Sequence, residues 1–101
     1  MAKIQIERNP TLPGEILAEE FLRPLGITQK KFADHLGVDI KVINRLINGK
    51  TSLSPELALK LSSSLGTTPE FWLSFQYELD LYYAKKNLKN LPSLINTKFN
   101  S

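Results

Sequence analysis

The segment that decides the fold is Thr28-Gln-Lys-Lys-Phe-Ala-Asp-His-Leu-Gly-Val-Asp-Ile-Lys-Val-Ile-Asn-Arg-Leu-Ile-Asn-Gly-Lys50. Its apolar residues form two short runs at helical spacing, one on each side of Gly37. Glycine adopts the left-handed conformation that lets a chain leave a helix at a steep angle, and Asp39 can cap the helix that follows. The spacing therefore predicts two short amphipathic helices packed together. Their inward-facing residues are Phe32, Ala33, Leu36, Ile43, Leu46 and Ile47.

The outward side of the second predicted helix is small, polar and basic. A guanidinium can bind both acceptors of guanine in a major groove, so Lys41 and Arg45, one turn apart, are the expected base readers. Asn44 can pair with adenine, and Ile40 can touch a thymine methyl or pack on the neighbouring helix. Two helices joined by a glycine turn, with such a surface on the second, predict a DNA-binding helix-turn-helix. The alternative is a solvated basic face.

Length and composition limit the other possibilities. A chain of 101 residues with 42% apolar content can build one compact domain but hardly two. It has no cysteine, so disulfides and thiolate metal sites are excluded, and no cofactor is expected. No segment approaches the roughly 18 consecutive apolar residues that span a bilayer, and the N-terminus lacks the apolar core of a secretory signal. We therefore expect a cytoplasmic protein without a membrane partner.

The net charge of +3 is weak evidence for a nucleic-acid partner, but its distribution is informative. Residues 28–50 contain five basic and two acidic side chains, whereas residues 13–23 contain one basic side chain and three acidic ones. The positive field therefore belongs to the helix-turn-helix. The acids of the other segment are Glu15, Glu19 and Glu20. Acids early in an exposed helix are usually solvated, and no nucleophile accompanies these three, so we do not expect an enzyme.

The whole chain is predicted to be all-α, with one five-helix domain over residues 12–87. Residues 1–11 are expected to form an extended arm or a short isolated strand, because Ile4 and Ile6 alternate with polar residues. Residues 88–101 place leucines between Asn, Ser and Lys around Pro92, which favours a loosely ordered tail.

Start and stop signals give the helix boundaries. The first helix is expected to begin near Pro13 and to stop at Pro24 and Gly26. Ser54-Pro-Glu and Thr68-Pro-Glu repeat one start signal, a hydroxyl cap followed by proline and an acid, and the last helix should run from Pro69 to about Asn87. The inward residues expected in these helices are Leu17, Phe21, Leu25, Leu57, Ala58, Leu61, Leu65, Phe71, Trp72, Phe75, Leu79 and Tyr82.

Several conspicuous residues have an ordinary structural explanation. Leu81 and Tyr83 lie off the apolar stripe of the last helix, so we expect them to pack against a second chain as a dimer seam. Trp72 and its aromatic neighbours are at helical spacing, which favours a core over a stacking platform for single-stranded RNA. His35 is the only histidine, and with no cysteine available it is expected to be a surface residue and not a metal ligand.

Residues 12–66 resemble the Cro-like, xenobiotic-response-element family of DNA-binding domains, most specifically at Thr28-Gln29, Ala33, Gly37, Ile43, Leu46 and Asn48-Gly49-Lys50. The flanks are similar to HigA-type antitoxins, also called virulence-associated protein I. The similar segments are Pro13-Gly-Glu-Ile-Leu-Ala-Glu-Glu-Phe-Leu-Arg-Pro-Leu-Gly26 and Thr67-Thr-Pro-Glu-Phe-Trp-Leu-Ser-Phe-Gln76. This resemblance spans residues 9 to about 83 and implies a five-helix Cro-like fold.

The resemblance also implies roles for individual residues. In Cro-like domains the residue after the first motif cap, here Gln29, contacts the phosphate backbone, as do residues at the end of the recognition helix, here Asn48 and Lys50. Asn48 is equally expected to stop that helix together with Gly49, and Asp39 to cap it and not to bind cytosine.

Implied partners are double-stranded operator DNA, a second copy of the chain and a HigB-type toxin. Such a dimer represses its own operon and neutralises the toxin, a ribosome-dependent messenger-RNA endonuclease of the RelE-like class. Glu15, Glu19 and Glu20 are the expected contact with a basic toxin, with the arm or residues 88–101 as alternatives. The other functional possibility is a stand-alone helix-turn-helix regulator without a toxin.

Overall fold

The computed structural model of the chain describes residues 9–95, whose regular secondary structure is entirely helical, with no strand. The first helical rod consists of α1 (Pro13–Ile16), η1 (Leu17–Leu22) and α2 (Arg23–Leu25) in direct succession. It is followed by α3 (Gln29–Leu36), α4 (Ile40–Ile47), α5 (Pro55–Leu65) and α6 (Pro69–Asn87). The all-α fold class is confirmed. The predicted arm lies mostly outside the described residues, and α6 ends at Asn87 as expected.

Four helices begin at side-chain caps that the sequence predicts. The hydroxyl of Thr28 accepts a hydrogen bond from the backbone N–H of Lys31 at 3.1 Å. Ser54 caps α5 at Leu57 with the same distance of 3.1 Å, and Thr68 caps α6 at Phe71, also at 3.1 Å. The fourth cap is Asp39, at the start of α4. Each cap satisfies a backbone donor that the first helical turn leaves unpaired, which is why these boundaries follow from local sequence.

The turn between α3 and α4 depends on Gly37. Its φ of 75° is left-handed, and the backbone N–H of Val38 donates to the carbonyl of Ala33 at 3.0 Å across the turn. An L-residue pays for this conformation in steric strain, so glycine is the favoured residue here. The tight turn sets α4 at a steep angle to α3.

The first helical rod corrects one prediction about the core. We expected Leu17, Phe21 and Leu25 to face inward at i+4 spacing. Leu17 is buried and Phe21 is half-buried, but Leu25 is 58% exposed and Leu22 is buried in its place. The cause is the π-helical geometry of η1, which adds a residue to the turn and brings positions five apart onto one side.

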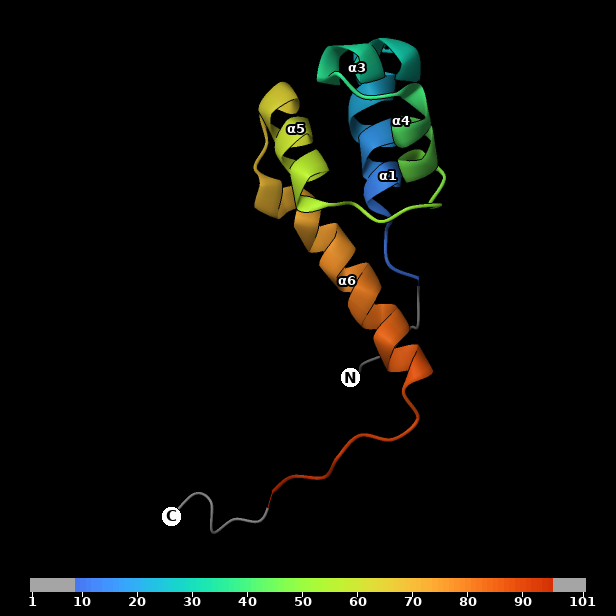
Figure 1. Cartoon of the computed structure of the whole chain (residues 1–101), viewed down its shortest axis with the longest axis vertical. Coiled ribbons are helices and arrows are strands. Elements are labelled where there is room, and N and C mark those ends of the chain that lie inside the picture. The colour runs from blue at the N-terminus through green and yellow to red at the C-terminus, as the bar shows by residue number, and fades with distance from the viewer. Residues whose placement is uncertain (1–8, 96–101) are drawn as a thin grey trace.

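Trp72 of α6 lies fully buried in the core. Around it pack side chains from every long helix and from the connection before α5 (Leu17, Leu22, Phe32, Ala33, Ile43, Leu46, Leu53, Leu57, Ala58 and Leu61). In Figure 1 the first rod, α3, α4 and α5 gather at one end of the molecule, and α6 extends away from them. The C-terminal half of α6 therefore projects beyond the core.

Beyond α6, residues 88–95 have no regular secondary structure and are exposed. The rest of the expected tail lies outside the described residues. Between residues 9 and 95, no helix has the length and apolar content needed to cross a membrane.

Candidate nucleic-acid interface

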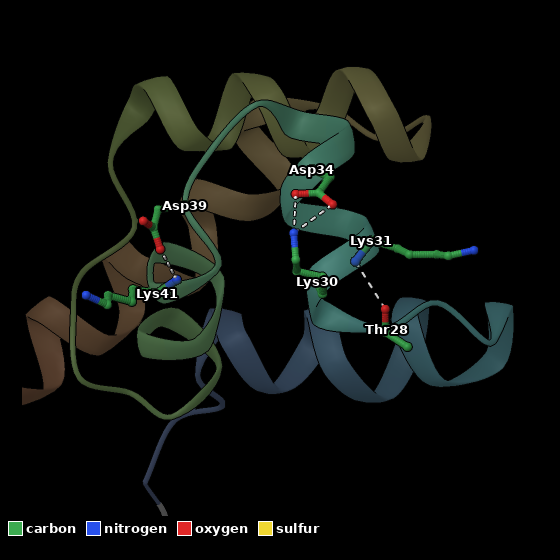
Figure 2. A network of polar contacts seen from close by, with 6 residues as sticks. All are labelled: Thr28, Lys30, Lys31, Asp34, Asp39 and Lys41. Carbon is green, nitrogen blue, oxygen red and sulfur yellow. Dashed lines mark hydrogen bonds and ion pairs between the residues drawn. The ribbon is translucent and has the colours of Figure 1, made fainter.

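The helix-turn-helix is formed by α3 and α4, and its inward side chains are those that the sequence predicts. Phe32, Ala33, Ile43 and Leu46 are buried, and Leu36 and Ile47 pack against the core. Figure 2 shows the polar contacts on the outer side of the two helices. Among them, Asp39 Oδ1 accepts a hydrogen bond from the backbone N–H of Lys41 at 2.8 Å. The structure therefore places Asp39 as a cap of α4.

The expected base readers share one exposed side of α4. Lys41, Asn44 and Arg45 are exposed, and Ile40 beside them is 39% exposed. Within residues 9–95, none of the ion pairs involves Lys41, Arg45 or Lys50. Lys30 of α3, in contrast, has both oxygens of Asp34 at 3.0 Å from its Nζ (Figure 2). The cations of α4 and of the segment after it are thus free to meet an anionic partner.

Gln29 and Asn44 are joined by a hydrogen bond that links the two helices of the motif. Asn44 Nδ2 donates to Gln29 Oε1 at 3.2 Å, across 15 residues of sequence. Gln29 keeps its amino group as a donor, and Asn44 keeps its oxygen and one N–H. A donor suits a phosphate oxygen, and an acceptor beside a donor suits adenine. The structure brings together two residues to which the sequence assigns separate contacts.

The end of α4 uses Asn48 as a structural stop. Its Nδ2 donates to the carbonyl of Asn44 at 3.0 Å, and the backbone N–H of Lys50 donates to the carbonyl of Arg45 at 2.8 Å. Gly49 between them has a left-handed φ of 68°. The predicted stop at Asn48 and Gly49 is confirmed, and Lys50 stands exposed next to the end of the recognition helix.

The three acids of the first rod have different surroundings. Glu15 Oε1 accepts from the backbone N–H of Leu12 at 3.0 Å, so this carboxylate serves the start of α1. Glu19 forms an ion pair with Arg23 at 3.2 Å. Glu20 is exposed, and no ion pair within residues 9–95 includes it. Only Glu19 and Glu20 are therefore free of a capping role.

Leu81 and Tyr83 are exposed, as expected of seam residues, but they do not share a side of α6. They are 36% and 49% exposed. Residues two apart in sequence are rotated by about 200° around an α-helix, so they face nearly opposite sides. Tyr83 lines a pocket together with Gln76 and Leu79, on the core side of the helix. Tyr77, four residues before Leu81 and 63% exposed, lies on the side of Leu81 instead.

Sequence reasoning missed Gln76, a buried polar residue of α6. Its side chain is hydrogen-bonded at both ends, to the backbone N–H of Leu53 and to Asp80. The partner of its oxygen is 23 residues away in sequence, so no local pattern indicates the contact.

The chain is similar to known helix-turn-helix proteins in sequence and in structure. The helix-turn-helix family model matches residues 17–72. Antitoxin HigA-1 of Vibrio cholerae is 39% identical over 92% of this chain and 88% of its own length. An uncharacterized HTH-type transcriptional regulator of Haemophilus influenzae is 40% identical over 90% of this chain and 85% of its own. The structure of antitoxin GraA in complex with its operator is similar with a TM-score of 0.73 at 33% identity, over 90% of this chain and 100% of that one.

The residues matched by the family model include both helices of the motif, α3 and α4. The two curated relatives align to 90% or more of the chain. The family consists of DNA-binding antitoxins and regulators, and its members are not enzymes. The chain belongs to the helix-turn-helix family and, within it, to the HigA-type antitoxins.

Proposed function

We propose that this chain is a sequence-specific operator-binding antitoxin that acts in the cytoplasm, represses its own operon and neutralises a HigB-type, RelE-like messenger-RNA endonuclease. The observation that carries the DNA-binding part is the exposed side of α4, where Lys41, Asn44 and Arg45 stand together without an acidic partner among residues 9–95. The relative solved with its operator supports the same use of this fold. Gln29, Asn48 and Lys50 are proposed to contact the flanking phosphates, and Ile40 to touch a thymine methyl.

Base reading and phosphate attraction can be separated by two alanine substitutions. Arg45→Ala should weaken binding to the promoter of the chain's own operon by roughly 1–3 kcal/mol and relax one base position. Lys50→Ala should weaken all DNA sequences alike and lower the slope of log K against log salt by about one unit. Fluorescence anisotropy with promoter and scrambled duplexes at several salt concentrations measures both. Equal losses on the two duplexes for both variants would show that the division of roles is wrong.

A twofold dimer is part of the proposal. One helix-turn-helix buries too little surface for a specific site, and two recognition helices about 34 Å apart match successive major grooves. The C-terminal half of α6 supports this arrangement, because the helix extends away from the other helices in Figure 1 and Leu81 is 36% exposed. We place the seam at Leu81 and Tyr77, which share one side of α6, and not at Tyr83, which lies on the opposite side.

The toxin contact is proposed to lie on the first rod. Gly14 of α1 packs on the backbone of Leu46 and Ile47, whereas Arg45 points to the exposed side of α4. A toxin bound to this rod would thus leave the DNA-reading side open. Next to Glu20, Phe21 meets Phe71 edge to face with ring centroids 6.4 Å apart, and Phe71 is 37% exposed. Carboxylates beside aromatic rings suit the arginines and lysines of a basic, RNA-gripping partner.

Charge reversal tests this contact. Glu19→Lys with Glu20→Lys should impair neutralisation of the basic polypeptide encoded by the neighbouring reading frame, and adding Glu15→Lys should impair it further while also weakening the start of α1. Glu56→Lys with Glu78→Lys is the matched control, because it makes the same charge change at exposed sites on α5 and α6. Deletion of residues 88–101 should leave neutralisation intact. Co-purification and a growth-rescue assay report the result, and neutralisation lost only on tail deletion would move the contact to the tail.

A stand-alone regulator is the second candidate, favoured by the Haemophilus influenzae relative named as a transcriptional regulator. Operator binding by the isolated chain with no co-purifying neighbour product would select it.

A further inference from the structure

Gln76 of α6 is buried, with 7% of its surface exposed, and both the oxygen and the nitrogen of its carboxamide are hydrogen-bonded. Its Oε1 accepts a hydrogen bond from the backbone N–H of Leu53 at 2.8 Å, and its Nε2 donates to Asp80 Oδ1 at 2.8 Å. Leu53 is itself only 3% exposed, so its N–H has no access to water that could replace this acceptor. The side chain therefore ties α6 to the segment that connects α4 with α5.

That connecting segment follows the recognition helix directly and has little freedom. It begins at Asn48, contains Lys50 and ends at Ser54, the cap of α5. A Cβ on Gly49 would approach Leu12 Cδ1 to 2.9 Å, so the start of the first rod packs closely on one side. Helix α6 also lies next to the segment. The first rod, the connecting segment and α6 together line a pocket of about 300 Å³, whose lining includes Lys50, Gln76 and Asp80.

The contact also lies at the boundary between the packed and the projecting parts of α6. Trp72, one turn before Gln76, is fully buried, while Leu81, just after Asp80, is 36% exposed. The bond to Asp80 lies within α6 and holds the Gln76 carboxamide in place, whereas the bond to Leu53 crosses to the connecting segment. Movement of α6 relative to that segment would have to break or strain the bond to Leu53, which thus joins the helix of the proposed dimer seam to the segment that contains Lys50.

We propose that Gln76 is a positioning residue for operator binding, which holds the end of the recognition helix at a fixed place relative to the dimerising helix. In the dimer this fixes the spacing of the two recognition helices. The inference rests on the proposed function, because it requires a dimer that binds two half-sites. Simultaneous binding of two linked sites raises affinity by about 10²–10⁴-fold only when the geometry fits both. Loss of the fixed spacing therefore lowers affinity for the full operator and spares the half-site.

The hydrogen-bond polarity of this contact gives a sharp test. Gln76→Glu keeps an acceptor for the N–H of Leu53 but places a second carboxylate against Asp80. Adding Asp80→Asn restores the bond with donor and acceptor exchanged. Full-operator and half-site duplexes should be titrated with the wild type, Gln76→Glu, Asp80→Asn and the double variant, at a temperature where circular dichroism shows all four folded. Sedimentation gives the dimer fraction of each.

Gln76→Glu should lose at least about tenfold in affinity for the full operator, with the half-site affinity changed less than threefold. The double variant should recover to within about threefold of the wild type. If Gln76→Glu does not fold, Gln76→Asn provides the comparison, because its shorter side chain keeps the carboxamide but draws the oxygen back from the N–H of Leu53.

Equal losses on both duplexes, or unchanged affinity in a folded Gln76→Glu, would overturn the positioning role. Wild-type chain that fails to bind either duplex would instead reject the proposed function.

Discussion

Replacing Trp72 with alanine is expected to lower the free energy of unfolding by about 3–5 kcal/mol. Its side chain is fully buried, and its ring centroid lies 5.4 Å from that of Phe21 and 5.1 Å from that of Phe71. Its Nε1 donates a hydrogen bond to Thr67 Oγ1 at 2.7 Å. The substitution removes this bond and opens a cavity where α6 meets the first rod. Since the total free energy of unfolding of a small domain is about 5–15 kcal/mol, the variant should be close to unfolding at 37 °C.

Urea denaturation followed by circular dichroism measures the loss, and two controls separate its parts. Thr67→Val removes only the hydrogen-bond acceptor and should cost about 1–3 kcal/mol. Leu59→Ala removes an apolar side chain of α5 that is 58% exposed, and it should change stability by no more than about 0.5 kcal/mol. A loss for Trp72→Ala no larger than that for Thr67→Val would mean that the tryptophan does not organise the core.

Gly14→Ala should destabilise the fold by about 3 kcal/mol and should also reduce operator binding by the molecules that remain folded. A Cβ at this position would lie 2.0 Å from the carbonyl oxygen of Leu46 and 2.5 Å from Cα of Ile47. Both are backbone atoms of α4, so the overlap cannot be relieved by rotating a side chain. The first rod and α4 must separate, and the loss of affinity for the operator should be at least about tenfold, or 1.4 kcal/mol.

Gly26→Ala is the matched control for this substitution. Gly26 has a left-handed φ of 67°, and an added Cβ would meet no atom within 4 Å. The control should therefore lower the free energy of unfolding only by the backbone strain, about 1–2 kcal/mol. It should leave the operator affinity of the folded protein unchanged. Chemical denaturation and anisotropy titration of the two variants side by side give the answer. Equal operator affinities for Gly14→Ala and Gly26→Ala would show that the close approach of α1 does not position α4.

The sequence predicts best what depends on neighbouring residues. The caps at Thr28, Asp39, Ser54 and Thr68 all bond to a backbone N–H two or three residues later, so their signals lie within one turn of chain. The outward side of α4 is predictable for the same reason, since helical spacing alone assigns it. These local features are enough to define the helix-turn-helix and its candidate DNA contacts.

What the sequence does not predict depends on geometry or on distant partners. The π-helical turn at η1 buries Leu22 and exposes Leu25, and i+4 periodicity cannot anticipate an added residue in the turn. The contact of Gln76 with Leu53 arises only when α6 packs beside the connecting segment. The opposite placement of Leu81 and Tyr83, in contrast, follows from the rotation per residue and could have been predicted from sequence spacing.

The hydrogen bond between Gln29 and Asn44 has a consequence for the entropy of recognition. Side chains that must be ordered on binding cost free energy, but these two amides already restrict each other before DNA arrives. Their shared bond also fixes which atoms face outward, with donors on Gln29 and an acceptor beside a donor on Asn44. Part of the surface that we propose meets the operator is thus preorganised, whereas Lys41 and Arg45 would still lose rotamer freedom on binding.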